Sequence, residues 1–293
     1  MNTNPWLLRF QSHMKAVETL KVKRFLKQLT SSLGMHPDFL VIGAQKAGTT
    51  SLYKHLVAHP SVLSAKTKEL HFFDYPWNYK KGVAWYRSHF PLKFWKYYYR
   101  LCLRKPCITG EASPYYLFHP HAAKRVASLL PRIKLIVLLR NPIDRAYSHY
   151  QHTVRRGKED LSFEDAIQNE ETRLKKEKEL LLLDENYFSF EYQYYSYLAR
   201  GIYWEQLERW FCYFPREQFL IIPSESFLKN PADVFPKVVR FLELPEYTLK
   251  SFNKYHTGSY SERPGQHVIR YLQDYFRPHN ERLYRLLGVG YDW

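Results

Sequence analysis

Short apolar runs alternate with stretches of helical spacing along most of the chain. Three such runs, at residues 39–43, 133–139 and 218–222, predict buried strands. Residues 51–58 and 202–214 carry apolar side chains at the intervals of a helix. Strands that alternate with helices indicate βαβ units, so we expect an α/β fold in which helices flank a central parallel sheet.

The first 36 residues differ from the rest of the chain. They carry six Lys or Arg residues and a single acidic residue, Glu18. Apolar side chains recur there at helical intervals, at Trp6, Leu7, Phe10, Met14, Val17 and Leu20. We therefore expect a basic, amphipathic helical extension over residues 1–36, followed by one domain over residues 37–293. Two interpretations of the extension stay open: a helix packed on the domain, or a peripheral contact with a membrane surface.

The composition narrows the class of protein. The 293 residues are 45% hydrophobic and 17% aromatic, which is enough to build a core and excludes a disordered chain. Three cysteines are too few for a disulfide scaffold, and aliphatic runs such as residues 135–139 are much shorter than a membrane span. Because the first residues also lack the apolar stretch of a secretion signal, we expect a cytoplasmic protein.

The charge balance indicates an anionic partner. The chain has 44 Lys or Arg residues against 28 Asp or Glu residues, a formal net charge of +16. Such a chain favours nucleic acid, acidic lipid, or a phosphorylated or sulfated small molecule. It contains neither a CxxC pair nor an HExxH motif, so we expect no metal site.

Aromatic residues form two dense clusters, at residues 94–99 and 187–197. Such clusters either provide a stacking platform for a planar or sugar ligand, or belong to the core and to helix faces. We expect core positions for most of these side chains and a place in the binding cleft for a few.

The segment FLVIGAQKAGTTSLY, residues 39–53, carries the most specific chemistry. Gly43 and Gly48 are five positions apart, between a predicted strand and a predicted helix, which is the glycine spacing of GxxxxGK[ST] phosphate loops. Glycines let the backbone N–H groups converge on an anion, and the helix N-terminus adds its dipole. The hydroxyl groups of Thr49, Thr50 and Ser51 can donate further hydrogen bonds. We therefore predict a phosphate loop resembling that of P-loop proteins.

This loop departs from the ATPase motif at its central residue. Thr49 follows Gly48 where an ATPase has lysine, and the lysine of this chain lies inside the loop as Lys46. No predicted strand ends in a convincing aspartate for Mg²⁺, which disfavours a P-loop kinase. We expect Lys46 to neutralise the leaving-group charge of an anionic nucleotide without a metal.

Two segments resemble the sulfotransferases that use 3′-phosphoadenosine 5′-phosphosulfate (PAPS). GAQKAGTTSL is similar to their 5′-phosphosulfate loop, and KLIVLLRNPIDRAYSHY, residues 134–150, is similar to their 3′-phosphate segment. The resemblance implies a phosphosulfate loop made of Lys46, Ala47, Gly48, Thr49, Thr50 and Ser51. It also implies that Arg140 and Ser148 bind the 3′-phosphate, which suits the forked grip of arginine on phosphate. Arg145 is either a further ligand or a residue of the helix surface.

Further stretches resemble the heparan sulfate N- and 3-O-sulfotransferases, including their bacterial relatives. They include KELHFFD at residues 68–74 and GEASPYY at residues 110–116. The resemblance implies that Glu69 is the general base, which takes the acceptor proton, and that His71 and Asp74 assist it or hold the acceptor. His71 is the alternative base, because its ordinary pKa lies nearer neutrality.

Two departures from that branch concern its charged contacts. Ala112 stands where those enzymes commonly have lysine, and the counterpart of their Lys-Gly-Arg-rich cofactor loop, residues 254–265, has fewer positive charges. From this loop the resemblance carries over Gly258, Ser259 and Tyr260 as backbone or adenosine contacts.

We therefore expect an enzyme that moves a sulfuryl group from PAPS to a hydroxyl or amine and releases adenosine 3′,5′-bisphosphate (PAP), with no metal required. The acceptor would be a carbohydrate or a small molecule, and no specific nucleic acid partner is expected. The alternatives are a basic nucleic-acid-binding protein and a P-loop kinase. Against the first, no RNP, helix-turn-helix or zinc signature is present.

Overall fold

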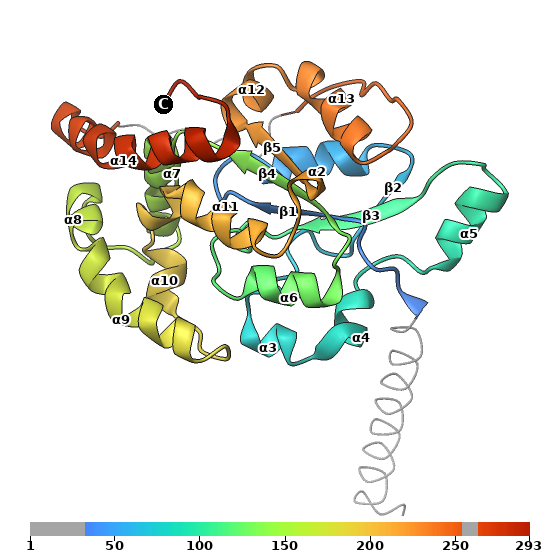
Figure 1. Cartoon of the computed structure of the whole chain (residues 1–293), viewed down its shortest axis with the longest axis horizontal. Helices are drawn as coiled ribbons and strands as arrows, with labels where there is room; N and C mark the ends of the chain where they lie inside the picture. Colours follow the sequence, from blue (N-terminus) through green and yellow to red (C-terminus); the bar gives the residue numbers. More distant parts are fainter. Residues whose placement is uncertain (1–32, 254–262) are drawn as a thin grey trace, which may run out of the picture.

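A single parallel sheet organises the described part of the chain, residues 33–253 and 263–293 of the computed structural model (Figure 1). Its five strands lie in the order β2-β3-β1-β4-β5, and all four pairings are parallel. The strands are β1 (Phe39–Gly43), β2 (Val62–Ser64), β3 (Ile108–Ala112), β4 (Lys134–Leu139) and β5 (Phe219–Pro223). The predicted α/β fold with a parallel sheet is confirmed, and three of the strands lie within one or two residues of their predicted bounds.

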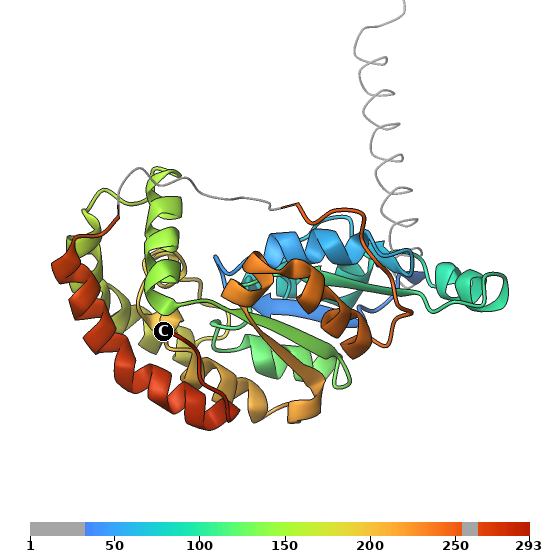
Figure 2. The same ribbon diagram turned by 90° about the horizontal axis from the view of Figure 1, so that it is seen from above.

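Helices cover both faces of the sheet (Figures 1 and 2). Over one face lie α2 (Thr49–Val57), α12 (Ser224–Lys229) and α13 (Pro231–Phe241), and over the other lie α6 (Ala122–Leu129) and α11 (Tyr203–Phe211). The remaining helices are α3 (Pro76–Tyr79), α4 (Gly82–Arg87), α5 (Phe94–Leu101), α7 (Pro142–Val154), α8 (Phe163–Gln168), α9 (Glu170–Leu183), α10 (Phe190–Tyr194), α14 (Gln266–Leu287) and two 3-10 turns, η1 (Ala199–Gly201) and η2 (Arg216–Gln218).

The core is centred on the two middle strands. Every residue of β1 and five of the six residues of β4 are buried, which explains why both strands are continuous apolar runs in the sequence. Met35, which precedes β1, is also buried in this core, and Gly34 forms a bridge with Leu92. None of the described helices is long and apolar enough to cross a membrane.

The two aromatic clusters have different surroundings. In the second cluster Tyr192 and Tyr197 are buried as expected, but Phe190 is exposed and the other aromatic side chains are half-buried. The expectation of core positions is wrong for the first cluster, because α5 contains no buried residue. The physical reason is its position: α5 lies in the connection between β2 and β3, beyond the end of the sheet, and no other labelled element covers it in Figure 1.

The charged stretch at residues 155–185 is mostly helical and is divided into α8 and α9. Leu174 and Leu181 of α9 are buried, so one side of that helix packs on the body. Most of the expected N-terminal extension, residues 1–32, lies outside the described residues, and so do Gly258, Ser259 and Tyr260.

Candidate functional site

A cavity of about 660 Å³ lies at the carboxyl ends of β1 and β4, where ligands of open α/β sheets generally bind. Most of the residues that the sequence singled out line it, although they come from distant parts of the chain. They are Lys46, Gly48, Thr49, Thr50, Ser51, Glu69, His71, Arg140 and Ser148. Ala47 is fully buried and does not line the cavity, and Asp74 lies behind His71.

The loop after β1 has the backbone of an anion-binding turn. Gly48 is the N-cap of α2 and has a φ of 91°, a left-handed conformation that glycine adopts without strain. Lys46 also has a positive φ, of 71°. At Gly43 a Cβ atom would lie 2.6 Å from the Leu117 side chain, so only glycine fits there. The two glycines that defined the motif are therefore both required by geometry.

Side chains from two other elements hold this loop in place. Arg140, directly after β4, donates from Nη1 to the carbonyl of Lys46 at 3.0 Å. Ser224 donates from Oγ to the carbonyl of Ala47 at 2.9 Å. A guanidinium has five N–H donors, so Arg140 can hold the loop and also face a ligand in the cavity.

The cavity wall around Lys46 is strongly positive. Burial, together with the charges of Arg155, Arg140 and Arg156, lowers the pKa of Lys46 to about 8. All four cations line the cavity. Like charges concentrated in a partly desolvated pocket bind an anion strongly, because the anion relieves their mutual repulsion.

Helix α7 forms one side of the cavity. Asn141 caps its N-terminus by accepting hydrogen bonds from the backbone N–H groups of Ile143 and Asp144, and Pro142 occupies the first turn. Ser148, His152 and Arg155 lie on the face that lines the cavity. Both sequence-based interpretations of Arg145, surface residue or ligand, need correction: it is fully buried, outside the cavity lining, and donates to the carbonyl of Tyr197.

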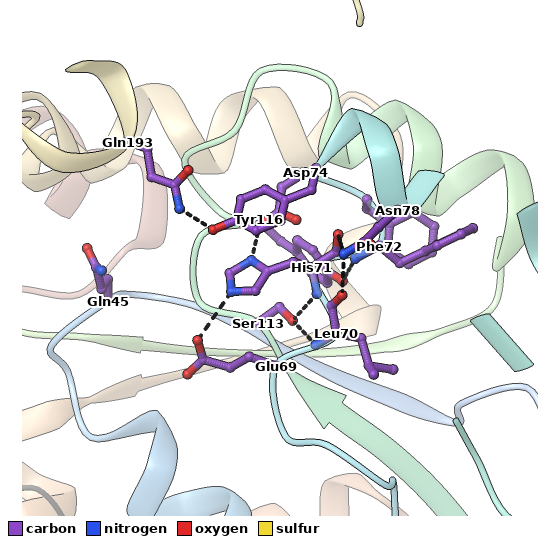
Figure 3. A network of polar contacts seen from close by, with 12 residues as sticks. Gln45, Glu69, Leu70, His71, Phe72, Asp74, Asn78, Ser113, Tyr116 and Gln193 are labelled. Carbon is purple, nitrogen blue, oxygen red and sulfur yellow. Dashed lines mark hydrogen bonds and ion pairs between the residues drawn. The ribbon is translucent and has the colours of Figure 1, made fainter. Parts of the chain in front are cut away.

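Three side chains of the segment after β2 form a chain of polar contacts (Figure 3). His71 Nδ1 lies 2.7 Å from Asp74 Oδ2, and His71 Nε2 lies 3.4 Å from Glu69 Oε2. The other carboxylate oxygen of Glu69 pairs with Lys68. The His71 ring stacks on Tyr75, with centroids 4.3 Å apart, which fixes its plane. The two candidate bases are thus direct neighbours.

The charges of these groups differ in a way that separates their roles. Burial lowers the pKa of His71, but Asp74 and Glu69 outweigh burial and raise this pKa to about 10. Burial raises the pKa of Glu69, but the contacts with His71 and Lys68 outweigh it and lower this pKa to about 2. At neutral pH His71 is therefore a cation and Glu69 is an ionised carboxylate. Of these two candidate bases, only Glu69 can accept a proton in that state.

A buried glutamate fixes the backbone of this segment. Glu111, on β3, accepts hydrogen bonds from the Tyr86 hydroxyl at 2.7 Å, from Ser113 Oγ at 2.7 Å and from the N–H of Leu70 at 3.1 Å. Ser113 Oγ in turn accepts from the N–H of His71 at 3.3 Å. Glu69 and His71 are therefore held by a network that starts in the sheet.

Sequence reasoning missed several residues of this site. Arg155, Arg156 and Arg200 line the cavity, and so do the aromatic side chains of Tyr75 and Tyr115. Tyr194 also lines it, as expected for a few side chains of the cluster at residues 187–197. Glu111 and Ser113 lie within the GEASPYY stretch, which was noted only for its resemblance to known enzymes. Their polar character between apolar neighbours was the available signal, because buried polar side chains require partners.

The comparisons with known proteins agree with this geometry. Residues 36–282 match the family model of the sulfotransferase domain. The chain belongs to the sulfotransferase family. The predicted family is confirmed, and so is the enzyme class, PAPS-dependent sulfotransferase.

Relatives of this sulfotransferase include curated proteins and a solved structure. It is 32% identical over 278 residues to heparan sulfate glucosamine 3-O-sulfotransferase 5 of Mus musculus, over 88% of this chain and 74% of that protein. It is 38% identical over 222 residues to bifunctional heparan sulfate N-deacetylase/N-sulfotransferase 3 of Homo sapiens, over 72% of this chain and 23% of that protein. The crystal structure of a sulfotransferase from Alicyclobacillus acidocaldarius matches with a TM-score of 0.63 and 30% identity, over 88% of this chain and 98% of that one.

Proposed function

We propose that this sulfotransferase transfers the sulfuryl group of PAPS to a hydroxyl or amine of a carbohydrate or small-molecule acceptor, with Glu69 as the general base. The observation that carries the proposal is that one cavity contains both the cationic loop of Lys46 and the ionised carboxylate of Glu69. A phosphate-binding cation and a proton acceptor are the two groups that sulfuryl transfer needs.

The donor fits the wall formed by the loop and α7. Lys46, Gly48, Thr49, Thr50 and Ser51 surround the N-terminus of α2, where backbone N–H groups and the helix dipole favour a phosphate. Arg140 and Ser148 line the same cavity, and we propose that they bind the 3′-phosphate. We propose Ala47 only as a backbone contact, and Gly258, Ser259 and Tyr260 as contacts on the adenosine side.

The reaction is an in-line displacement at sulfur. The acceptor oxygen or nitrogen forms a bond to sulfur while the bond between sulfur and the 5′-phosphate oxygen breaks. Glu69 takes the proton that the acceptor loses, and Lys46 offsets the negative charge that develops on the departing phosphate. No metal is required in this scheme, because Lys46 and Arg140 supply the positive charge.

His71 and Asp74 support the base. The His71 cation lies between the two carboxylates and keeps Glu69 oriented toward the cavity. With a pKa of about 2, Glu69 is a weak base. Loss of the His71 contact would make it more basic, but its carboxylate would no longer be held in one orientation. We propose that the orientation of Glu69 affects the transfer rate more than its basicity does. We also propose that His71 contacts the acceptor.

The remaining lining suits an acceptor with ring-shaped and acidic parts. Tyr75, Tyr115 and Tyr194 provide faces on which sugar or planar rings stack, and Arg155 and Arg156 provide positive charge. The names of the curated relatives describe heparan sulfate as their substrate. For this chain we propose the broader class of carbohydrates and small molecules.

An acceptor screen with radiolabelled PAPS tests the proposal. We expect label on sugar or small-molecule acceptors in the presence of a metal chelator, and inhibition by added PAP. DNA binding that weakens steeply with salt, without transfer to any hydroxyl or amine, would instead support the nucleic-acid alternative. Transfer that requires Mg²⁺ would contradict the metal-free scheme.

A further inference from the structure

Helix α5 exposes an unusual number of large apolar side chains. Phe94, Tyr97 and Leu101 share one face of the helix and are 65%, 61% and 69% exposed. Trp95 and Tyr98 flank this face and are also exposed. Single exposed apolar residues are ordinary, but several gathered on one helix mark an interaction surface.

The same surface is cationic. The sequence holds eight Lys or Arg residues and no acidic residue between Tyr75 and Gly110. Four of these cations lie beside or on α5 and are exposed: Lys93, Arg100, Arg104 and Lys105. A fifth, Lys96, forms an ion pair with Asp38 at 2.6 Å and thereby ties the helix to the body.

The position of α5 relates it to the start of the chain and separates it from the catalytic cavity. The N–H of Lys93 donates to the carbonyl of Leu33 at 2.8 Å, so the basic sequence of residues 1–32 joins the body beside α5. The helix precedes β3 and extends beyond the end of the sheet opposite to α7 and α14 (Figures 1 and 2). The cavity lies at the carboxyl ends of the strands, near α7.

We propose that α5 and its flanking cations dock on the surface of an acidic lipid bilayer. Tyr and Trp side chains favour the boundary between headgroups and acyl chains, and Lys and Arg side chains are attracted to acidic headgroups. The aromatic side chains of α5 suit the boundary between headgroups and acyl chains, and the flanking cations suit the acidic headgroups.

Charge and apolar surface together favour an acidic bilayer over three other partners of α5: residues 1–32, a second copy of the chain, and a soluble polyanion. Residues 1–32 carry six cations and one acid, so placing them over α5 would bring like charges together. A second copy of the chain would meet the same repulsion at a symmetric contact. A soluble polyanion would pair with the cations but leave the aromatic stripe in water. Because the surface lies far from the cavity, the inference does not depend on the proposed function.

Vesicle sedimentation of the full-length chain tests the proposal. We expect binding to phosphatidylcholine vesicles that contain about one third phosphatidylserine, and much weaker binding to phosphatidylcholine alone. The double variant F94S/Y97S should lower the partition coefficient on the order of tenfold, because it removes the apolar stripe and keeps every charge. The matched control Y213S/Y271S alters two exposed tyrosines elsewhere and should bind as the parent does.

Unchanged vesicle binding by F94S/Y97S, at an unchanged melting temperature, would overturn the proposal. An equal loss of binding to vesicles and to inorganic polyphosphate would also overturn it and indicate a polyanion site. A concentration-dependent dimer that F94S/Y97S abolishes, without vesicle binding by the parent, would assign α5 to contact with a second copy.

Discussion

Lys46 illustrates how a single side chain connects loop geometry with charge. Its backbone turns in the left-handed region and its carbonyl is held by Arg140, so the side chain enters a pocket that other cations already occupy. Those cations and burial make its proton easier to lose than that of an ordinary lysine. The residue was recognisable in the sequence, but its perturbed pKa was not, because Arg155 and Arg156 lie more than a hundred positions away.

Donor binding should therefore depend on pH above about 8, the value to which the pKa of Lys46 is lowered. Above this value the free enzyme loses the Lys46 proton and must regain it to bind PAP. The dissociation constant should rise by up to about tenfold per pH unit. Lys46→Arg keeps its charge and should flatten this rise. Calorimetric titration with PAP from about pH 7 to pH 10 measures the dissociation constant of the parent and of Lys46→Arg at each pH. The same slope in both proteins would exclude Lys46 as the titrating group.

Arg140→Ala should weaken binding of PAP more than binding of adenosine 5′-phosphate. The charged contact with the 3′-phosphate corresponds to about ten- to hundredfold in affinity. Any disturbance of the Lys46 loop weakens binding of both ligands, so it cancels in the ratio of their two dissociation constants. Ser148→Ala should change the ratio less, because a hydroxyl is a weaker donor. An equal loss for both ligands would show that Arg140 only holds the loop.

At the scale of elements, the sequence predicted β1, β4 and β5 because each is an apolar run. It missed β2, which has three residues, and β3, whose buried sequence contains Gly110 and Glu111. Glu111 and Ser113, which follows β3, anchor the segment of Glu69 and His71. Their partners are about 40 residues away along the chain, so spacing could not reveal the network. The exposure of α5 was missed for a related reason, since composition does not show where the sheet ends.

Ser113→Ala tests whether the sheet positions the catalytic segment. It removes the hydrogen bonds to Leu70 and His71 and one donor to Glu111. We expect a loss of about 1–2 kcal/mol in the free energy of unfolding by urea. The rate of transfer should fall while the affinity for PAP stays the same. Ser128→Ala, at an exposed serine on α6, is the control. A fall in stability without a fall in rate would limit Ser113 to a structural role.

At the scale of the whole molecule, the fold brings together segments that are distant in the sequence. Four segments meet in one cavity: the loop of Lys46, the segment of Glu69, the turn between β4 and α7 at Arg140, and the region of Arg200. The positive charge of the chain contributes to two separate surfaces, this cavity and the surface around α5. Net charge alone suggested nucleic acid as one partner, whereas we propose a nucleotide for the charge in the cavity and a bilayer for the charge around α5.

The transfer rate of Glu69→Gln under single-turnover conditions shows whether Glu69 takes the acceptor proton. The amide keeps the shape and the hydrogen bonds of the carboxylate but cannot accept the proton. We expect a rate lower by about 10²- to 10⁴-fold, with PAP affinity unchanged. Glu208→Gln, which alters an exposed glutamate of α11, should transfer at the parental rate. Transfer by Glu69→Gln at the parental rate, together with an inactive His71→Ala, would exclude Glu69 as the base and assign the proton to His71.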